Sequence, residues 1–322
     1  MAKTTKRPKI AIVMDPIQSV AAYKDTTIGM IWAAQDYADV HYLNLADLWI
    51  ANGQAMTCSQ LLVLHNDQGK GDWYQLGERN TRPASQFDII LMRKDPPFDM
   101  EYIYATYILD RAQVSGVTVS NHPQALRDIN EKAYTAWFPE LCPPTLITRD
   151  MQRMVNFQQT HGSVVAKPLD GMGGKSIFVI HPKDGNRQVI FETLTDHGKR
   201  FAMVQGFIPE ITETGDQRII IIDGKAAPYA LARIPVPGEH RGNLAAGGKG
   251  QGVPLSSAAQ KIANVVGPEL KKRGVLFAGL DVIGNYMTEI NVTSPTGIRE
   301  LNSQFDLDLG RDYVNALLKQ IR

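Results

Sequence analysis

Residues 164–180 read VVAKPLDGMGGKSIFVI and decide the fold, because a glycine-rich loop lies between two stretches of strand character. The loop ends in Gly174-Lys175-Ser176, like a P-loop, but Leu169 stands where that motif needs a glycine. A P-loop also continues into a helix, whereas residues 176–180 are typical of a strand. The dinucleotide fingerprint fails as well, since Ser176 replaces its last glycine. The sequence therefore predicts a glycine hairpin, which either folds its N–H groups over a triphosphate or is only a flexible tip.

Three neighbouring segments could serve the same ligand. Lys167 lies in a strand pattern that favours an apolar residue, and a buried lysine usually has an anionic partner. Lys132 lies in DINEKAYTAWF (128–138), which has helical character, so its side chain could equally be solvated. Residues 205–208 follow a strand pattern, and their backbone could pair with an adenine or form a plain core strand.

A second hairpin is predicted at residues 279–297, GLDVIGNYMTEINVTSPTG, with its turn at Gly284-Asn285. Residues two apart in a strand share a face, so Asp281, Glu289 and Asn291 can meet. An oxygen-only set of this kind suits Mg²⁺. The two carboxylates would repel each other on an apolar hairpin unless a cation lies between them. A solvated hairpin edge is the alternative.

The N-terminal third predicts an open α/β sheet. Unbroken apolar runs at 10–15 and 87–93, with a short run at 117–121, indicate strands, and the first two are typical of parallel strands covered on both faces. Helical patterns at 26–38 and 101–115 lie between them. Polar side chains follow two of these strands, at the edge where such sheets bind ligands: Asp15, Arg93 and Lys94. Arg93 and Lys94 either face substrate carboxylates or pair with Asp95 and Asp99.

The rest of the chain predicts α+β lobes. Strands at 218–223 and 227–234 should be joined by a turn at Asp223-Gly224, and a helix is expected near 308–321. We therefore expect an N-terminal open α/β domain at residues 1–122, a central lobe at 123–208 and a C-terminal lobe at 209–322. The fold class is α/β and α+β.

Composition narrows the function classes. Lys and Arg number 34 against 33 Asp and Glu, a balance that argues against a generic nucleic-acid binder. The two cysteines, Cys58 and Cys142, form no metal or disulfide spacing and fit a reducing compartment. The N-terminal apolar run is too short for a signal peptide, and no run suits a membrane span. We expect a cytoplasmic protein without membrane or nucleic-acid partners.

The order of these motifs resembles the ATP-grasp superfamily, and longer segments resemble the prokaryotic glutathione synthetase family along nearly the whole chain. The segments that carry this resemblance are VMDPI (13–17), LMRKDPPFD (91–99), YIYATYIL (102–109), NEKAYTAWFPE (130–140), KPLDGMGG (167–174), ARIPVPGEHRGNLAAGG (232–248), GLDVIG (279–284) and TEINVTSPTGIRE (288–300). The resemblance implies an ATP-grasp fold with an N-terminal preATP-grasp domain. It also implies that ATP and Mg²⁺, with Mn²⁺ as a substitute, drive ligation of γ-glutamylcysteine to glycine, and that the chain forms a homotetramer.

The resemblance also implies a role for each candidate residue. The ATP-binding set is Lys132, Lys167, the flap Gly171, Met172, Gly173 and Gly174, the adenine hinge Gln205, Gly206, Phe207 and Ile208, and Asp216 at the ribose. The metal ligands are Asp281, Glu289 and Asn291, and the catalytic arginines are Arg218, Arg233 and Arg241, the last in a mobile glycine-rich loop at 238–252. The substrate-binding set is Asp15, Arg93, Lys94, Thr293, Ser294, Pro295 and Thr296.

The residues alone leave two other functions open. Another ATP-grasp carboxylate–amine ligase, similar to D-alanine–D-alanine ligase or an amino-acid ligase, shares the ATP-binding motifs. A nucleotide-binding regulatory protein without turnover is a second alternative, although the full set of Lys167, Asp281, Glu289 and Asn291 disfavours it. No nucleophilic serine or cysteine motif is present, as expected if phosphoryl transfer needs only positioning and charge neutralisation.

Overall fold

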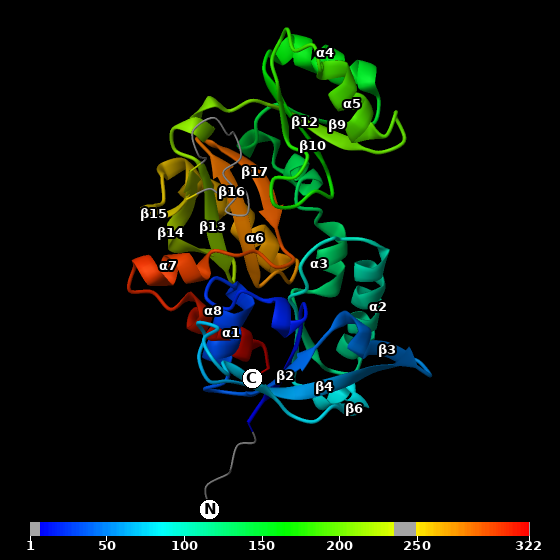
Figure 1. The fold of residues 1–322 in the computed structure, drawn as a ribbon, viewed down its shortest axis with the longest axis vertical. Helices are drawn as coiled ribbons and strands as arrows, with labels where there is room; N and C mark the ends of the chain where they lie inside the picture. The colour runs from blue at the N-terminus through cyan, green and yellow to red at the C-terminus, as the bar shows by residue number, and fades with distance from the viewer. Residues whose placement is uncertain (1–6, 235–248, 322) are drawn as a thin grey trace, which may run out of the picture.

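The computed structural model describes residues 7–234 and 249–321, and within these residues the chain forms three sheets with helices packed on them (Figure 1). The first sheet, at the N-terminal end of the described chain, has the strand order β3-β4-β2-β1-β7-β8, with β5 and β6 paired to β4. Strands β2, β1, β7 and β8 are parallel, which confirms the predicted strands at 10–15, 87–93 and 117–121. The strands are β1 (Lys9–Val13), β2 (Asp39–Leu43), β3 (Leu48–Ala51), β4 (Gln54–Leu64), β5 (Tyr74–Leu76), β6 (Asn80–Pro83), β7 (Ile89–Met92) and β8 (Thr118–Ser120).

Strand β1 shows why both faces of this sheet are covered. Successive side chains point to opposite faces, so Ala11 and Val13 join one apolar core while Ile10 and Ile12 join another. The first core is completed by α2 (Met100–Val114) and α3 (Pro123–Asp128), and the second by α1 (Thr26–Ala34) and α8 (Leu309–Leu318). The predicted C-terminal helix is therefore confirmed, and it packs on the first sheet.

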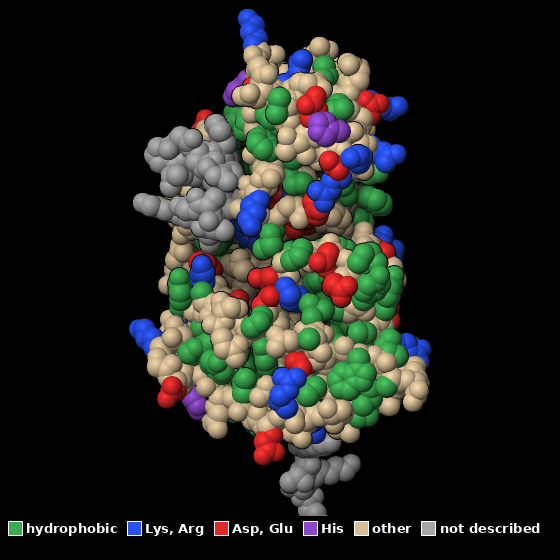
Figure 2. Space-filling model, turned by 45° about the vertical axis from the view of Figure 1, so that its right-hand side comes forward, with side chains coloured by type: hydrophobic (Ala, Val, Ile, Leu, Met, Phe, Trp, Pro, Cys, Tyr) green, Lys and Arg blue, Asp and Glu red, His purple; other side chains and the backbone are tan. Residues whose placement is uncertain are grey.

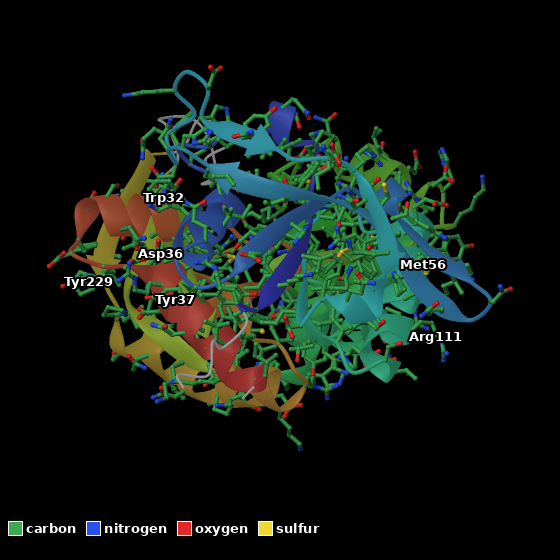
Figure 3. All side chains as sticks on the ribbon, turned by 90° about the horizontal axis from the view of Figure 1, so that it is seen from below. Trp32, Asp36, Tyr37, Met56, Arg111 and Tyr229 are labelled. Atoms are coloured by element: carbon green, nitrogen blue, oxygen red, sulfur yellow. The ribbon has the colours of Figure 1, made fainter. Side chains whose placement is uncertain are left out.

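Figure 3 shows this layering from below. The strands of the first sheet separate α1 and α8, on the side of the labelled Trp32, from α2, on the side of the labelled Arg111. Arg111 on α2 donates a hydrogen bond to the carbonyl of Gly53 (3.0 Å) in the turn between β3 and β4, which ties this helix to the sheet's edge.

The second sheet forms the upper lobe of Figure 1 and has the antiparallel order β11-β10-β12-β9. Helices α4 and α5 cover one face, where Met154 and Phe191 pack on Val164, Ala166 and Val204 of the strands. The other face is left to line a cavity described below. The elements are β9 (Thr145–Thr148), α4 (Met151–His161), β10 (Val164–Pro168), β11 (Phe178–Ile180), α5 (Arg187–Thr195) and β12 (Ala202–Gly206).

The third sheet is antiparallel, in the order β15-β14-β13-β16-β17, with α6 on one face. Ile262 and Val266 of α6 share a core with Ile219 of β13 and Leu280 of β16, so the alternate residues of these strands face the opposite side. The turn predicted at Asp223-Gly224 is confirmed, with φ of 50° and 78°. The elements are β13 (Asp216–Ile222), β14 (Lys225–Ile234), β15 (Lys249–Pro254), α6 (Ser257–Lys272), β16 (Phe277–Ile283), β17 (Tyr286–Asn291) and α7 (Ile298–Gln304).

Asn121, at the end of β8, joins the first sheet to the third. Its amide donates to the carbonyls of Phe277 (2.8 Å) and Val292 (2.6 Å), and its oxygen accepts from the N–H groups of Leu276 (2.8 Å) and Phe277 (3.1 Å). A buried amide with every group paired fixes the two layers against each other. The domain boundaries at 122 and 208 remain predictions.

Two predicted segments differ from the structure. The helix expected over 128–138 is absent from the described chain there, because the side chain of Asn130 accepts from the N–H groups of Lys132 and Ala133 and turns the backbone into a single 3-10 turn, Ala133–Trp137. The glycine-rich run at 238–252 does not form a loop throughout, because residues 249–252 pair with β14 as part of β15. Residues 238–248 lie outside the described residues.

Within residues 7–234 and 249–321, the structure contains no helix with the length and apolar character that a membrane span requires.

Candidate active site

The glycine hairpin predicted at 170–176 connects β10 and β11, which pair antiparallel. Gly173 and Gly174 have φ of 64° and 79°, a left-handed conformation that glycine adopts without steric cost. Lys132 reaches the hairpin, since its ammonium donates to the carbonyl of Gly171 (2.6 Å). Met172 and Gly173 line a large cavity below the hairpin. The predicted glycine hairpin is therefore confirmed and has a cavity beneath it, while its role as a flap over a triphosphate stays a prediction.

Lys132 and Lys167 flank the carboxylate of Glu289. Each ammonium lies 3.6 Å from Glu289 Oε1, and Lys132 also pairs with Glu131. Both lysines are almost completely buried, so a solvated Lys132 is wrong. Burial lowers the pKa of Lys167. Burial acts in the same direction on Lys132, but the neighbouring Glu289 and Glu131 outweigh it and raise the pKa of that ammonium. Two buried, charged amines beside a cavity are what a polyphosphate requires.

Asp281 lies directly opposite Glu289 in the β16–β17 pairing. Its side chain is 2% exposed, so the alternative of a solvated hairpin edge is wrong. Arg218 binds Asp281 through two nitrogens, and Arg233 Nη2 lies 2.9 Å from Asp281 Oδ2. Burial alone would raise the pKa of Asp281, but the two guanidinium groups hold it below its usual range. The repulsion predicted between the carboxylates is thus balanced here by cationic side chains.

The predicted metal ligands come together on this hairpin. Asn291 Nδ2 lies 3.4 Å from Asp281 Oδ2, and Glu289 pairs across from Asp281. The described residues hold no cluster of three or more His, Cys, Asp or Glu side chains that could bind a metal unaided. Two carboxylates and an amide oxygen nevertheless fit Mg²⁺, because this ion usually takes one or two carboxylates and fills its remaining positions with water and phosphate oxygens.

A first cavity lies between the second and third sheets. Its walls are mainly apolar, and the predicted adenine hinge, residues 205–208, lines it together with Val165 and Ile211. Lys167, Glu289 and Asp216 supply its polar end. Residues 205–208 are therefore more than a plain core strand, since Gln205 and Gly206 end β12 and all four residues line the cavity.

Asp216 is the most perturbed acid of this first cavity. Burial raises its pKa to about 7, although Arg233 pairs with it. Among the described residues, its Oδ1 atom is buried without a hydrogen-bond partner. An unpaired buried acceptor costs free energy that an incoming hydroxyl group would recover.

A second cavity of about 680 Å³ lies between the third sheet and the first. Of the predicted site residues, it is lined by Asp15, Met172, Gly173, Arg218, Arg233, Asn291, Thr293, Ser294, Pro295 and Thr296. Glu289 faces the first cavity and Asn291 the second, so the acidic hairpin is the wall between them. Figure 2 shows Lys, Arg, Asp and Glu side chains around the notch between the upper lobe and the body.

Neither Arg93 nor Lys94 is among the residues that line this cavity. Arg93 is 4% exposed and donates to Thr27 Oγ1 (3.2 Å) and to the carbonyls of Thr293 (3.3 Å) and Pro295 (3.2 Å). It therefore lies behind the loop that carries predicted substrate residues and holds that loop in place. Lys94 pairs with Asp15 (2.8 Å) and not with the side chains of Asp95 or Asp99. Arg241 lies outside the described residues.

Five acidic or basic side chains of the second cavity were not predicted. Asp95 lines it and accepts a hydrogen bond from Ser294, and Glu131 lines it beside Lys132. Lys24 and Asp25 line it from the turn before α1, and Glu300 lines it from α7. Three of the five lie inside the sequence motifs quoted above, which could have drawn attention to them: Asp95, Glu131 and Glu300. Lys24 and Asp25 had no such signal, because the turn before α1 carries no pattern.

Comparison with known proteins decides the family. The model of the prokaryotic glutathione synthetase N-terminal domain matches residues 9–127, and that of the prokaryotic glutathione synthetase ATP-grasp domain matches residues 131–306. The chain belongs to the prokaryotic glutathione synthetase family. It is a ligase that uses ATP to form a C–N bond between γ-glutamylcysteine and glycine.

Relatives of this family match along almost their full length. Glutathione synthetase of Shewanella oneidensis is 55% identical over 302 residues, covering 94% of this chain and 95% of that protein. The Vibrio cholerae enzyme is 50% identical over 315 residues, covering 98% of each. The Escherichia coli enzyme is 48% identical over 316 residues, covering 97% of this chain and 99% of its own.

Solved structures support the fold. The crystal structure of D-cycloserine synthetase DcsG is similar with a TM-score of 0.67 at 14% identity, covering 98% of this chain and all of that one. The ATP-grasp ligase PsnB, complexed with minimal precursor, Mg and ADP, has a TM-score of 0.59 at 15% identity, covering 97% and 98%. At these identities the likeness shows the ATP-grasp fold alone, which confirms the predicted fold class.

Proposed function

We propose that the ligation takes place at the wall between the two cavities, with ATP in the first and γ-glutamylcysteine and glycine in the second. The observation that carries this assignment is the acidic hairpin, whose Glu289 faces one cavity and whose Asn291 faces the other. A phosphoryl group that passes from nucleotide to peptide must cross this wall. The apolar walls that residues 205–208 help to form suit an adenine, and the unpaired Asp216 oxygen suits a ribose hydroxyl.

The chemistry needs an activated carboxylate. A free carboxylate does not react with an amine at neutral pH, because its leaving group would be oxide. The cysteinyl carboxylate of γ-glutamylcysteine attacks the γ-phosphorus of ATP, and the bond from that phosphorus to ADP breaks. The amine of glycine then attacks the resulting acyl phosphate, loses a proton, and expels inorganic phosphate to give glutathione. Positioning and charge neutralisation drive both steps.

Lys132 and Lys167 bind the phosphates in this proposal. Their ammonium groups lie against Glu289 in the described structure, so they are already gathered at the end of the first cavity. The hairpin carbonyl of Gly171, which now accepts from Lys132, is exchanged for a phosphate oxygen when ATP binds. Lysine ammonium groups on phosphate oxygens form charge-assisted hydrogen bonds, which are stronger than neutral ones.

Asp281, Glu289 and Asn291 would hold Mg²⁺, for which Mn²⁺ is a substitute. A metal ion held by these residues would supply neutralisation of the charge on the transferred phosphoryl group. Arg218 and Arg233 line the second cavity and would bind the reacting carboxylate and the acyl phosphate. Both arginines are anchored by Asp281, so they are positioned before substrate arrives.

Thr293, Ser294, Pro295 and Thr296 form the floor of the second cavity and would bind the peptide, with Asp15 at its rim. Arg93 supports this floor from behind. Arg241 belongs to the glycine-rich segment that we propose closes over the acyl phosphate, which water would otherwise hydrolyse. The cytoplasm, which supplies ATP and keeps thiols reduced, is the proposed compartment, and a homotetramer is the proposed assembly.

The test is phosphate release from ATP with a panel of substrates. We expect release only when γ-glutamylcysteine and glycine are both present, with glutathione formed in equal amount. Comparable turnover with D-alanine alone would assign the chain to another ATP-grasp ligase. Tight ATP binding without phosphate release on any substrate pair would instead support a regulatory nucleotide-binding protein.

A further inference from the structure

Asn130 belongs to a short segment that joins the glycine hairpin to the acidic hairpin. Its Nδ2 atom donates a hydrogen bond to the carbonyl of Leu169 (3.1 Å), at the base of the glycine hairpin. The carbonyl of the next residue, Glu131, accepts from the N–H group of Ile290 (2.7 Å), which lies between two predicted metal ligands on β17. Residues 130–132 therefore connect the two hairpins through hydrogen bonds on both sides.

Asn130 also fixes the backbone that carries Lys132. Its Oδ1 atom accepts from the N–H groups of Lys132 (3.1 Å) and Ala133 (2.8 Å), as an N-cap side chain does at the start of a helix. The ammonium of Lys132 in turn donates to the carbonyl of Gly171 (2.6 Å). One amide side chain thus acts on the glycine hairpin twice, directly through its nitrogen and indirectly through its oxygen.

The direct contact differs from the other contacts at the base of the hairpin. In the described structure, side chains from other segments hold three consecutive residues there: Asn130 holds Leu169, Arg200 holds Asp170, and Lys132 holds Gly171. The ion pair of Arg200 lies at the surface, with 67% of its side chain exposed, and such pairs contribute little. Lys132 gives up its carbonyl partner when a phosphate takes the ammonium. The hydrogen bond from Asn130 involves no phosphate-binding group, so it remains.

A third, small cavity lies beside this hydrogen bond. Its volume of about 30 Å³ is enough for a water molecule. Asn130 and Leu169 both line it, and it shares Pro96, Glu131 and Thr293 with the second cavity. Water in the small cavity is therefore next to the cavity in which the proposed acyl phosphate forms.

We infer that Asn130 is a positioning residue that keeps the base of the glycine hairpin fixed while Lys132 turns to the phosphates, and so keeps water from the acyl phosphate. This inference rests on the proposed function. Without the Nδ2 donor, the carbonyl of Leu169 takes a water molecule as its partner. The hairpin then closes over ATP in a smaller fraction of molecules, which weakens the apparent affinity for ATP. Water that reaches the acyl phosphate releases phosphate and returns γ-glutamylcysteine, so ATP is consumed without glutathione.

Two substitutions remove the donor to Leu169 and keep the cap. Asn130→Asp has the same shape but only acceptor atoms, and Asn130→Ser is uncharged but too short to reach the carbonyl; both residue types are good caps. Loss of one neutral hydrogen bond shifts an equilibrium by about 2- to 10-fold. For each variant we expect the KM for ATP to rise by about 2- to 10-fold and phosphate release to exceed glutathione formation. The wild type should form the two products in equal amounts.

Asn66 offers a matched control, because it makes the same kinds of contact in another turn. Its Oδ1 atom accepts from the N–H groups of Gln68 (3.1 Å) and Lys70 (3.3 Å), and its Nδ2 atom donates to the carbonyl of Lys70 (2.9 Å). Other residues line the three cavities described above. Asn66→Asp and Asn66→Ser should therefore keep the KM for ATP and form phosphate and glutathione in equal amounts.

The amounts of phosphate and glutathione separate positioning from a general loss of structure, since a loosened fold lowers Tm and kcat but leaves the two products equal. The inference is overturned if the Asn130 variants form the products in equal amounts, if their KM for ATP stays at the wild-type value, or if the Asn66 variants show the same excess of phosphate. Should one Asn130 variant fail to fold, the other decides. A Lys132→Met protein with an unchanged KM for ATP would instead refute the proposed placement of the phosphates, whatever the Asn130 variants do.

Discussion

Replacing Arg93 with methionine separates support of the substrate loop from contact with the substrate. The guanidinium group holds the carbonyls of Thr293 and Pro295 and the hydroxyl of Thr27, and it lies 5.3 Å from the ring centre of Phe277. Methionine keeps the apolar stem and removes all three hydrogen bonds. The perturbation is therefore confined to the junction between the first and third sheets.

The size of the effect follows from the groups left unpaired. Two carbonyls lose their donor, and an unsatisfied buried acceptor costs about 1–3 kcal/mol. Removing a buried charge recovers part of that cost, so we expect a net loss of about 2–4 kcal/mol. For a chain of this length, each kcal/mol lowers Tm by roughly 2 °C. Arg93→Met should therefore melt about 4–8 °C below the wild type without ligand, and its KM for γ-glutamylcysteine should rise because the loop is loosened.

Thermal melting of the ligand-free protein, followed by circular dichroism, measures the first effect, and initial rates of phosphate release measure the second. Arg111→Met is the matched control, since this exposed arginine makes one hydrogen bond, to Gly53, far from the cavities. Its Tm should change by less than about 2 °C, as for most surface substitutions. An Arg93→Met protein that melts like the wild type but binds the peptide poorly would refute the reasoning and return Arg93 to direct substrate contact.

Two further predictions follow from single side chains. Glu289→Ala should abolish phosphate release while the far-ultraviolet circular dichroism spectrum stays unchanged. The control variant Glu192→Ala on α5 should keep full activity. Undiminished phosphate release by Glu289→Ala would exclude Glu289 as a metal ligand. Burial lowers the pKa of His41 to about 4 from an ordinary value of 6.5. As the pH falls, the imidazole is therefore protonated in the unfolded chain before it is protonated in the folded one. The free energy of unfolding that this side chain contributes above pH 6.5 is lost as the pH falls toward 4. His41→Phe should flatten the fall of Tm over that pH range, and an unchanged slope would contradict the shift.

Sequence periodicity predicted the elements whose signals are local. The glycine hairpin, the turn at Asp223-Gly224 and the acidic hairpin each contain their own turn residues and flanking strands, so each could be identified without distant contacts. The helix over 128–138 was wrong because propensity does not register that one side chain, Asn130, takes two backbone N–H groups.

The candidate site was predictable as a set of residues and less so as a set of contacts. Asp281, Glu289 and Asn291 share a face by simple alternation, and the structure brings them together. That Arg218 and Arg233 neutralise Asp281 depends on the pairing of β13 with β14 and β16, which local patterns do not specify. The position of Arg93 behind the loop depends on a contact 200 residues away in the sequence.

The return of α8 to the first sheet has a consequence for the order in which the molecule can be made. Helices α1 and α8 cover the same face of that sheet, although the second lies near the other end of the sequence. During synthesis, the strands of the first sheet leave the ribosome long before the helix that covers them. Until α8 has been synthesised, part of the apolar surface of Ile10, Ile12 and the buried side of α1 therefore stays in contact with water. A nascent chain released before that point would expose this apolar surface to other chains.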